Sequence, residues 1–141
     1  MSASNLERLA QAFAGWGKDN PAAMRDLLHP DCELVVPESL PYGGTFRGVD
    51  AVIAWFTREL WSWFDTFSST PEGPIDGGDR IAVPVRVQAR TKHGASVDVR
   101  NVWIYEFRDG RLTRGQVYAD TAVLRNALEG VSPRGVSPRG T

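Results

Sequence analysis

The stretch from Val97 to Asp120 constrains the fold of this chain more than any other. It reads VDVRNVWIYEFRDGRLTRGQVYAD, with Asp109-Gly110 between two runs rich in β-branched and aromatic residues. Asp-Gly in that setting is the strongest short-range signal for a two-residue β-hairpin turn. We therefore predict paired antiparallel strands over residues 95–108 and 112–119, followed by a last helix that Asp120 caps.

Hydrophobic spacing, proline and glycine define the other elements. Ser4-Asn5-Leu6-Glu7 has the form of a capping box and predicts that a helix begins there. Asn20 is the expected cap of a second, short helix, which ends before His29-Pro30. The remaining predictions are a strand over 33–36, a loop over 38–48, a helix over 50–65 capped by Asp50, a strand over 67–70, a turn over 76–79 and a strand over 80–91.

This order of elements predicts an α+β fold. N-terminal and central helices that pack on one face of a curved antiparallel sheet give a cone-shaped domain. We expect that domain over residues 1–129. The segment 130–141 contains Gly-Val-Ser-Pro-Arg twice in succession and should be a disordered tail, with an interaction segment as the alternative.

Composition excludes several classes of partner and site. The net charge of −1 gives no electrostatic reason to expect nucleic acid or an anionic membrane. One cysteine, Cys32, and two histidines predict no disulfide, no metal site and no cofactor. No apolar run reaches the roughly 20 residues of a membrane span, and a cytoplasmic location follows by default. Five tryptophans point instead to an apolar small-molecule site.

Strand alternation sorts side chains between the two faces of the sheet. On the longest strand the more aromatic set should face the helices: Val97, Val99, Asn101, Trp103, Tyr105 and Phe107. The opposite set should form an outer face for a homodimer contact, centred on Val102 and Ile104 with Tyr118 nearby. On the strand over 112–119 we assign to the inside Thr113, Gly115, Val117 and Ala119. On the strand over 80–91 the inner set is Ala82, Pro84, Arg86, Gln88 and Arg90. On the strand over 33–36 it is Leu34 and Val36, with Glu38 just past the end of the strand.

The inner surface is therefore expected to be apolar with a few convergent polar groups, which is the composition of a small-molecule pocket. Its expected ligand-binding residues are Trp103, Val117, Gln88, Val36, Val99, Tyr105, Trp55 and Phe56. Gly115 and Ala119 leave room opposite Trp103, although the alternative is a cone that side chains fill completely. A buried Arg86 would need a carboxylate, either Glu38 or one on a ligand.

The hairpin sequence, together with Gly43-Gly44-Thr45-Phe46-Arg47-Gly48-Val49-Asp50 before an aromatic-rich helix, resembles the SnoaL-like branch of the nuclear transport factor 2-like superfamily. The resemblance covers residues 5 to about 129 and implies the cone-shaped fold. It also implies a cofactor-independent cyclase, isomerase or lyase that acts on a hydrophobic polyketide-, terpenoid- or steroid-like molecule. A non-catalytic binding protein of the same fold is the alternative.

The catalytic residues of known relatives are not matched. In ketosteroid isomerase-like proteins the base, acid and tyrosine positions correspond to Val36, Trp103 and Ala12, none of which can do that chemistry. The cyclase aspartate and histidine correspond to Val117 and Trp103. The Arg-x-Asp of limonene-epoxide-hydrolase-like proteins corresponds to Arg86-Val87-Gln88, so that only the arginine is kept.

The remaining candidates for catalysis are the polar residues Arg86, Glu38, Asn101 and Asp120. Asp120 has a second interpretation as the cap of the last helix. His29 is expected to be structural at a helix end, and His93 to be solvated in a turn.

Overall fold

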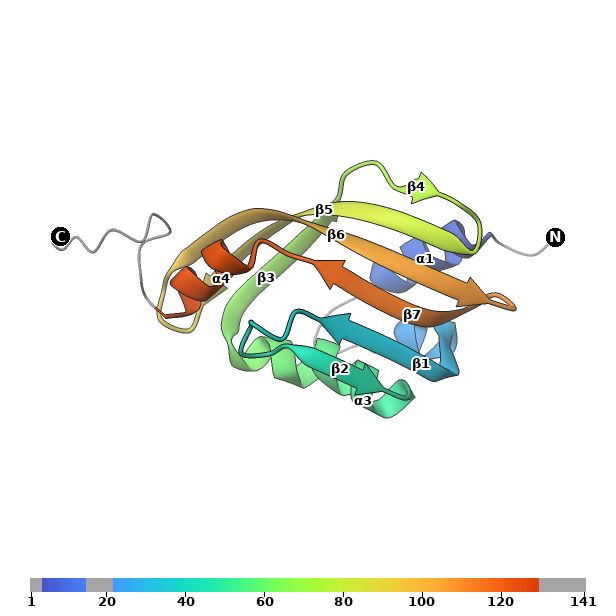
Figure 1. Cartoon of the computed structure of the whole chain (residues 1–141), viewed down its shortest axis with the longest axis horizontal. Helices are drawn as coiled ribbons and strands as arrows, with labels where there is room; N and C mark the ends of the chain where they lie inside the picture. The colour runs from blue at the N-terminus through green and yellow to red at the C-terminus, as the bar shows by residue number, and fades with distance from the viewer. Residues whose placement is uncertain (1–3, 15–21, 130–141) are drawn as a thin grey trace, which may run out of the picture.

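The computed structural model describes residues 4–14 and 22–129 and shows a curved sheet that arches over the helices (Figure 1). In chain order the elements are α1 (Asn5–Ala14), α2 (Ala22–Leu27), β1 (Leu28–Val36), β2 (Gly44–Arg47), α3 (Val49–Ala54), β3 (Phe64–Pro71), β4 (Ile75–Asp76), β5 (Arg80–Thr91), β6 (Ser96–Arg108), β7 (Arg111–Tyr118) and α4 (Thr121–Leu128). The helix α3 continues as a π turn over Trp55–Glu59 and a 3-10 turn over Leu60–Ser62. The expected α+β cone with N-terminal and central helices is confirmed.

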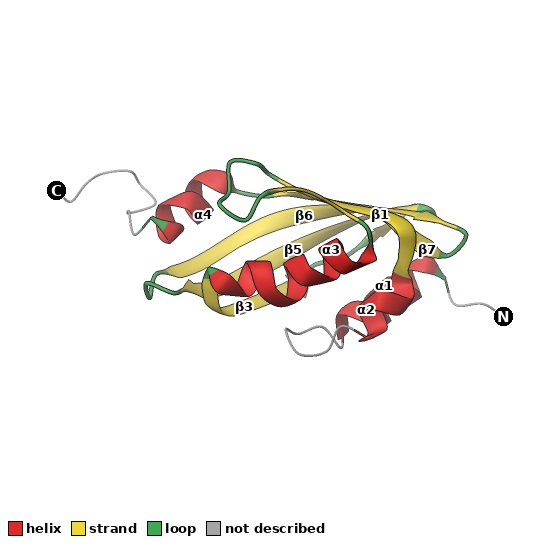
Figure 2. Ribbon diagram, turned by 90° about the horizontal axis from the view of Figure 1, so that it is seen from below, coloured by secondary structure: helices red, strands yellow, loops and turns green. Residues whose placement is uncertain are grey.

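The sheet has the strand order β2-β1-β7-β6-β5-β3, and β4 pairs with β5. All of these pairings are antiparallel except the one between β1 and β7, which is parallel. Figure 2 shows α3 lying across the concave side of the sheet, with α1 and α2 at one end and α4 at the other. The helices and the concave face therefore enclose the apolar interior.

The Asp109-Gly110 hairpin is confirmed, and its geometry explains the sequence. Both residues have positive φ angles, 53° and 77°, as a two-residue turn of this type requires. A β-bulge follows at once, because Glu106 pairs with Arg114 whereas the next residue, Phe107, pairs with Leu112. The bulge places Leu112 in the core, so the prediction that Thr113 faces inward is wrong.

The predicted helix caps are confirmed at the first and last helices. The Ser4 backbone N–H donates to Glu7 Oε1 at 3.0 Å, and the Glu7 backbone N–H donates to Ser4 Oγ at 3.1 Å. Asp120 Oδ1 accepts a hydrogen bond from the Val123 backbone N–H at 3.2 Å. The predicted Asn20 cap and the segment 130–141 lie outside the described residues.

The middle of the chain differs from the prediction. The N-cap of α3 is Gly48, at φ 91°, and not Asp50. Asp50 instead lies exposed in the first turn and accepts a hydrogen bond from Arg25 at 3.1 Å. The expected loop over 38–48 contains β2, which is held by pairing with β1. The helical segment also ends earlier than predicted, since β3 begins at Phe64.

The predicted inner face of β6 is confirmed, but the face predicted for β5 is wrong. Val87 pairs with Val99 of β6, and Arg86 pairs with Arg100. Directly opposed residues of an antiparallel pair share a face, so Val87 follows buried Val99 inward and Arg86 follows exposed Arg100 outward. The inward residues of β5 are Ile81, Val83, Val85, Val87 and Ala89, and those that point outward are Ala82, Pro84, Arg86, Gln88 and Arg90.

Among the described residues, no helix is both long enough and apolar enough to cross a bilayer.

Candidate ligand-binding site

A cavity of about 140 Å³ lies between the concave face of the sheet and the helices. The strands β1, β3, β5, β6 and β7 contribute inward residues, and α1, the α3 extension and α4 close the cavity. The lining residues are Leu6, Leu9, Ala10, Phe13, Val36, Leu40, Tyr42, Trp55, Phe56, Leu60, Phe67, Ser69, Pro71, Pro74, Val83, Val85, Val87, Asn101, Trp103, Tyr105, Val117, Ala119 and Leu124.

The exposed members of this lining mark the mouth of the cavity. They are Ala10 of α1, Ser69 and Pro71 at the end of β3, and Pro74 in the segment that leads to β4. The other lining residues are buried or partly buried. A ligand would therefore enter between α1 and the end of β3.

Aromatic rings form one wall of the cavity. Trp103 and Tyr105 of β6 stack with ring centroids 5.5 Å apart and planes 8° from parallel. Phe56 lies 6.1 Å from Trp103 and meets Trp55 edge-on at 4.8 Å. Trp55 is itself fixed, because its indole N–H donates to the Tyr42 carbonyl at 2.9 Å. Such a wall is suited to flat apolar groups.

The wall coincides with a break in regular helix geometry. Trp55 and Phe56 begin the π turn, and both are buried and line the cavity although they are adjacent in sequence. π turns inside helices are frequent at functional sites. Thr57 Oγ1 donates to the Ile53 carbonyl at 2.8 Å and so satisfies an acceptor of the helix at this point.

The polar groups of the lining are neutral. Tyr42, Tyr105 and Asn101 are buried, and Ser69 is exposed at the mouth. Burial raises the pKa of the Tyr42 and Tyr105 phenols well above the usual range. Both hydroxyls therefore stay protonated at neutral pH and can act as hydrogen-bond donors.

Most of the predicted ligand-binding residues do meet around this cavity. The lining contains Trp103, Val117, Val36, Tyr105, Trp55 and Phe56, together with Asn101 from the set of candidates for catalysis. Val99 is buried on the same face of β6 but is not part of the lining. Gln88 is exposed on the outer face of β5. Glu38 is exposed in the turn after β1 and does not reach the cavity.

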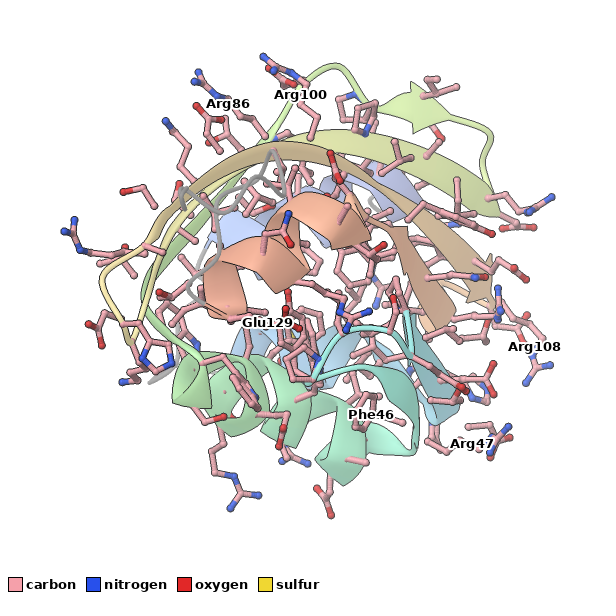
Figure 3. All side chains as sticks on the ribbon, turned by 60° about the vertical axis from the view of Figure 1, so that its left-hand side comes forward. Phe46, Arg47, Arg86, Arg100, Arg108 and Glu129 are labelled. Atoms are coloured by element: carbon pink, nitrogen blue, oxygen red, sulfur yellow. The ribbon has the colours of Figure 1, made fainter. Side chains whose placement is uncertain are left out.

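Arg86 lies on the convex side of the sheet, and the prediction that it points into the cone is wrong (Figure 3). Its Nε donates to Asp98 Oδ1 at 2.9 Å, and its Nη2 donates to Asp98 Oδ2 at 2.6 Å. Hydrogen bonds from Arg86 lower the pKa of the Asp98 carboxyl. The arginine thus has its carboxylate partner on the neighbouring strand and needs neither Glu38 nor a ligand.

The remaining candidates have structural roles. Asp120 caps α4, as described above, and its backbone N–H donates to Asn101 Oδ1 at 3.4 Å. His29 lies within β1 and not at a helix end, and its Nδ1 accepts a hydrogen bond from the Asp31 backbone N–H at 3.0 Å. His93 is exposed in the turn between β5 and β6, as predicted.

Residues 4–14 and 22–129 contain no group of three or more His, Cys, Asp or Glu side chains that could hold a metal ion.

The predicted ligand-binding residues omitted much of the lining, including the contributions of α1, β3, β5, α4 and the loop between β1 and β2. The β5 residues Val83, Val85 and Val87 could have been found from the apolar alternation along that strand. Tyr42 lies in the loop between β1 and β2, where no periodic pattern gives its direction. Its position depends on contacts with Trp55 and Phe64, which are distant in the sequence.

Fold and cavity together define a cone-shaped domain with an apolar internal cavity. A family model described as the SnoaL-like domain matches residues 9–115, and the chain belongs to that family. An uncharacterized protein of Mycobacterium tuberculosis is 28% identical over 124 residues, which cover 87% of this chain and 95% of the relative.

Two solved structures extend the likeness. An NTF2-like protein of unknown function from Burkholderia pseudomallei has a TM-score of 0.82 at 25% identity and covers 90% of this chain and 98% of its own. TerC, co-crystallized with polyporic acid, has a TM-score of 0.81 at 25% identity. The match covers 90% of this chain and 99% of the TerC chain. The suspected branch of the NTF2-like superfamily is thus confirmed.

Proposed function

We propose that this protein binds a hydrophobic small molecule in the cavity between the sheet and the helices. The observation that carries the proposal is the cavity itself, which is apolar, walled by aromatic rings and lined by exposed residues at one end. Sites of this composition are typical of small-molecule binding. The likeness to TerC, which was crystallized with a small molecule, supports the same interpretation.

The size of the cavity limits what it can enclose. Its volume of about 140 Å³ is close to that of a cavity of about 150 Å³ that holds benzene. A steroid or a multi-ring polyketide exceeds this volume. Such a ligand would place one ring, or an isoprenoid segment of that size, inside and extend through the mouth beside Ala10 and Pro71.

A cofactor-independent reaction of cyclase, isomerase or lyase type is the second candidate. The observation that favours it is the set of buried neutral donors, because fixed donors in a dry site stabilise negative charge that develops on an oxygen. The described part of the lining contains no carboxylate or imidazole to act as a base. Binding without chemistry is therefore the function that the geometry supports best.

Ligand-observed NMR with ethylbenzene, a neutral one-ring hydrocarbon, tests the first proposal. The wild-type protein should bind it saturably. Val117→Phe fills the cavity from β7 and should weaken binding at least about tenfold, a difference of roughly 1.4 kcal/mol. The matched change Gln116→Phe, on the opposite face of the same strand, should leave binding unchanged. Equal affinity in the two variants would place the ligand elsewhere.

Deuterium exchange separates the two candidates. An isomerase-type site removes a proton from the carbon next to a carbonyl. Acetophenone incubated with the protein in D₂O should exchange its methyl protons no faster than in buffer if the protein only binds. Exchange above the buffer rate that Val117→Phe abolishes would establish the enzymatic candidate.

We also propose that the outer face of the sheet binds a second copy of the chain. Val102 and Tyr118 are paired across β6 and β7 and are 36% and 56% exposed, which is high for large apolar side chains. Ile104 lies beside them and is partly buried. A net charge of −1 gives little repulsion between copies.

A cytoplasmic location remains a prediction from the sequence.

A further inference from the structure

The cavity contains buried hydrogen-bond donors that the described part of the protein leaves unused. Tyr42 and Tyr105 are 4% and 5% exposed. Neither hydroxyl forms a hydrogen bond with any residue in the ranges 4–14 and 22–129, although both side chains line the cavity. Buried polar groups are nearly always paired, so an unpaired hydroxyl needs an explanation.

Asn101 adds a third donor, and its orientation follows from chemistry. Its side chain is 7% exposed, and one of its terminal atoms faces the backbone N–H of Asp120 at 3.4 Å. A backbone N–H can only donate, so the facing atom must be the oxygen, Oδ1. The amide nitrogen Nδ2 then lies on the other side, and no described residue accepts from it.

The described residues that line the cavity around these donors carry no positive charge that could pair with an anion. The described lining residues include no lysine, arginine or histidine. The nearby arginine of β5, Arg86, points to the convex side and is already paired with Asp98. A carboxylate in the cavity would be a buried charge with no counter-ion, which is strongly unfavourable.

We propose that Asn101, Tyr42 and Tyr105 form a donor subsite that selects a neutral ligand with a carbonyl oxygen over its hydrocarbon and carboxylate counterparts. This rests on the proposed function and names its ligand chemistry. Asn101 and Tyr105 lie on one face of β6 four positions apart, about 13 Å along the strand, with Trp103 between them. They therefore meet different parts of a ligand, and Trp103 offers a ring surface in between.

Three one-ring probes of similar size test this subsite: acetophenone, ethylbenzene and benzoate. Titrations followed by ligand-observed NMR should show that the wild-type protein binds acetophenone roughly tenfold more tightly than ethylbenzene. Benzoate at pH 7 should bind at least about tenfold more weakly than acetophenone, since it brings an uncompensated charge.

The decisive variant combines Asn101→Leu, Tyr42→Phe and Tyr105→Phe. It should bind ethylbenzene at least as tightly as the wild type and lose the preference for acetophenone, and the single variants show which donor the ketone uses. Ser68→Ala, which removes the hydroxyl of an exposed β3 residue outside the lining, is the control and should keep the preference. Melting temperatures should not fall in the Tyr→Phe variants, because those hydroxyls lose no partner.

Each outcome separates this inference from the proposed function. Binding of ethylbenzene with no preference for acetophenone, or a preference that survives in the triple variant, overturns the donor subsite and leaves hydrophobic binding intact. A lower melting temperature in Tyr42→Phe and Tyr105→Phe would show that their hydroxyls serve the fold, and would also overturn it. Failure of all probes to bind overturns the proposed function and the subsite with it.

Discussion

Gly115 lies directly beneath the ring of Tyr105, its partner across β6 and β7. A Cβ at this position would be 3.3 Å from two atoms of that ring and 3.7 Å from Leu34 Cδ1. The ring cannot easily move away, because it stacks on Trp103 and also contacts Phe13. The absence of a side chain here therefore allows the aromatic wall to form.

Gly115→Val should overpack this site and lower the free energy of unfolding by about 1–3 kcal/mol. Urea denaturation followed by circular dichroism measures the effect. Gln116→Val changes the next residue, on the opposite face, and should stay within about 0.5 kcal/mol of the wild type. Equal stability of the two variants would mean that the ring of Tyr105 can yield.

The Arg86–Asp98 pair makes a pH-dependent contribution that can be isolated. Hydrogen bonds from Arg86 lower the pKa of Asp98 in the folded state, so the pair stabilises the fold above the ordinary carboxyl range. That contribution is lost as the pH falls through the lowered pKa.

Arg86→Met should therefore reduce the melting temperature slightly at pH 7 and reduce it less as the pH falls toward the lowered pKa. Both partners are about half exposed, so high salt should also shrink the difference. Melting curves of the two proteins at several pH values provide the measurement. Affinity for ethylbenzene should be unchanged, and a loss of affinity would contradict the outward position of Arg86.

At the scale of elements, the last helix depends on its cap. Asp120→Ala removes the acceptor for the Val123 backbone N–H and should cost about 0.5–2 kcal/mol of stability. Asp120→Asn keeps a capping oxygen and should lose much less. Thermal unfolding of the two variants compares them. If both variants bind acetophenone as the wild type does, Asp120 acts as a cap and not as part of the ligand site.

Local signals in the sequence were sufficient for the elements that local chemistry specifies. The Asp109-Gly110 turn, the Ser4 capping box and the Asp120 cap depend on neighbours within a few residues, and all three are confirmed. The strand β2 was missed because four residues at a sheet edge become a strand only through pairing with β1. The π turn of Trp55–Glu59 likewise has no local sequence signature.

The site was predictable where alternation had an unambiguous apolar face. Along β6 the inward set is aromatic and was assigned correctly, which placed Trp103, Tyr105 and Asn101 in the cavity. Along β5 we assigned the alternating set that contains Arg86 to the inside, although Val83, Val85 and Val87 form the more apolar set. A shift of one residue reverses every side chain of a strand, so this single choice inverted the face.

For the whole molecule, the outer sheet face predicts assembly. Val102→Glu would place a carboxylate in the centre of the proposed contact and should convert a homodimer to a monomer, as measured by light scattering at micromolar concentration. Gln88→Glu adds the same charge to the same face away from Val102 and should leave the dimer intact. A wild-type mass equal to one chain would contradict the proposal.

The parallel pairing of β1 with β7 has a consequence for how the protein is made. Arg114 of β7 and its ion-pair partner Glu33 of β1 are 81 residues apart, so this junction forms from distant parts of the chain. Without β7, the sheet separates into β2-β1 on one side and β6-β5-β3 on the other.

A ribosome therefore releases both halves of the sheet before it releases the strand that joins them. Until then the apolar concave surface is open to solvent, and long-range pairing of this kind is slow and exposed to aggregation. We expect the nascent chain to be most prone to aggregation in that interval, which ends only when Tyr118, the last residue of β7, has left the ribosome.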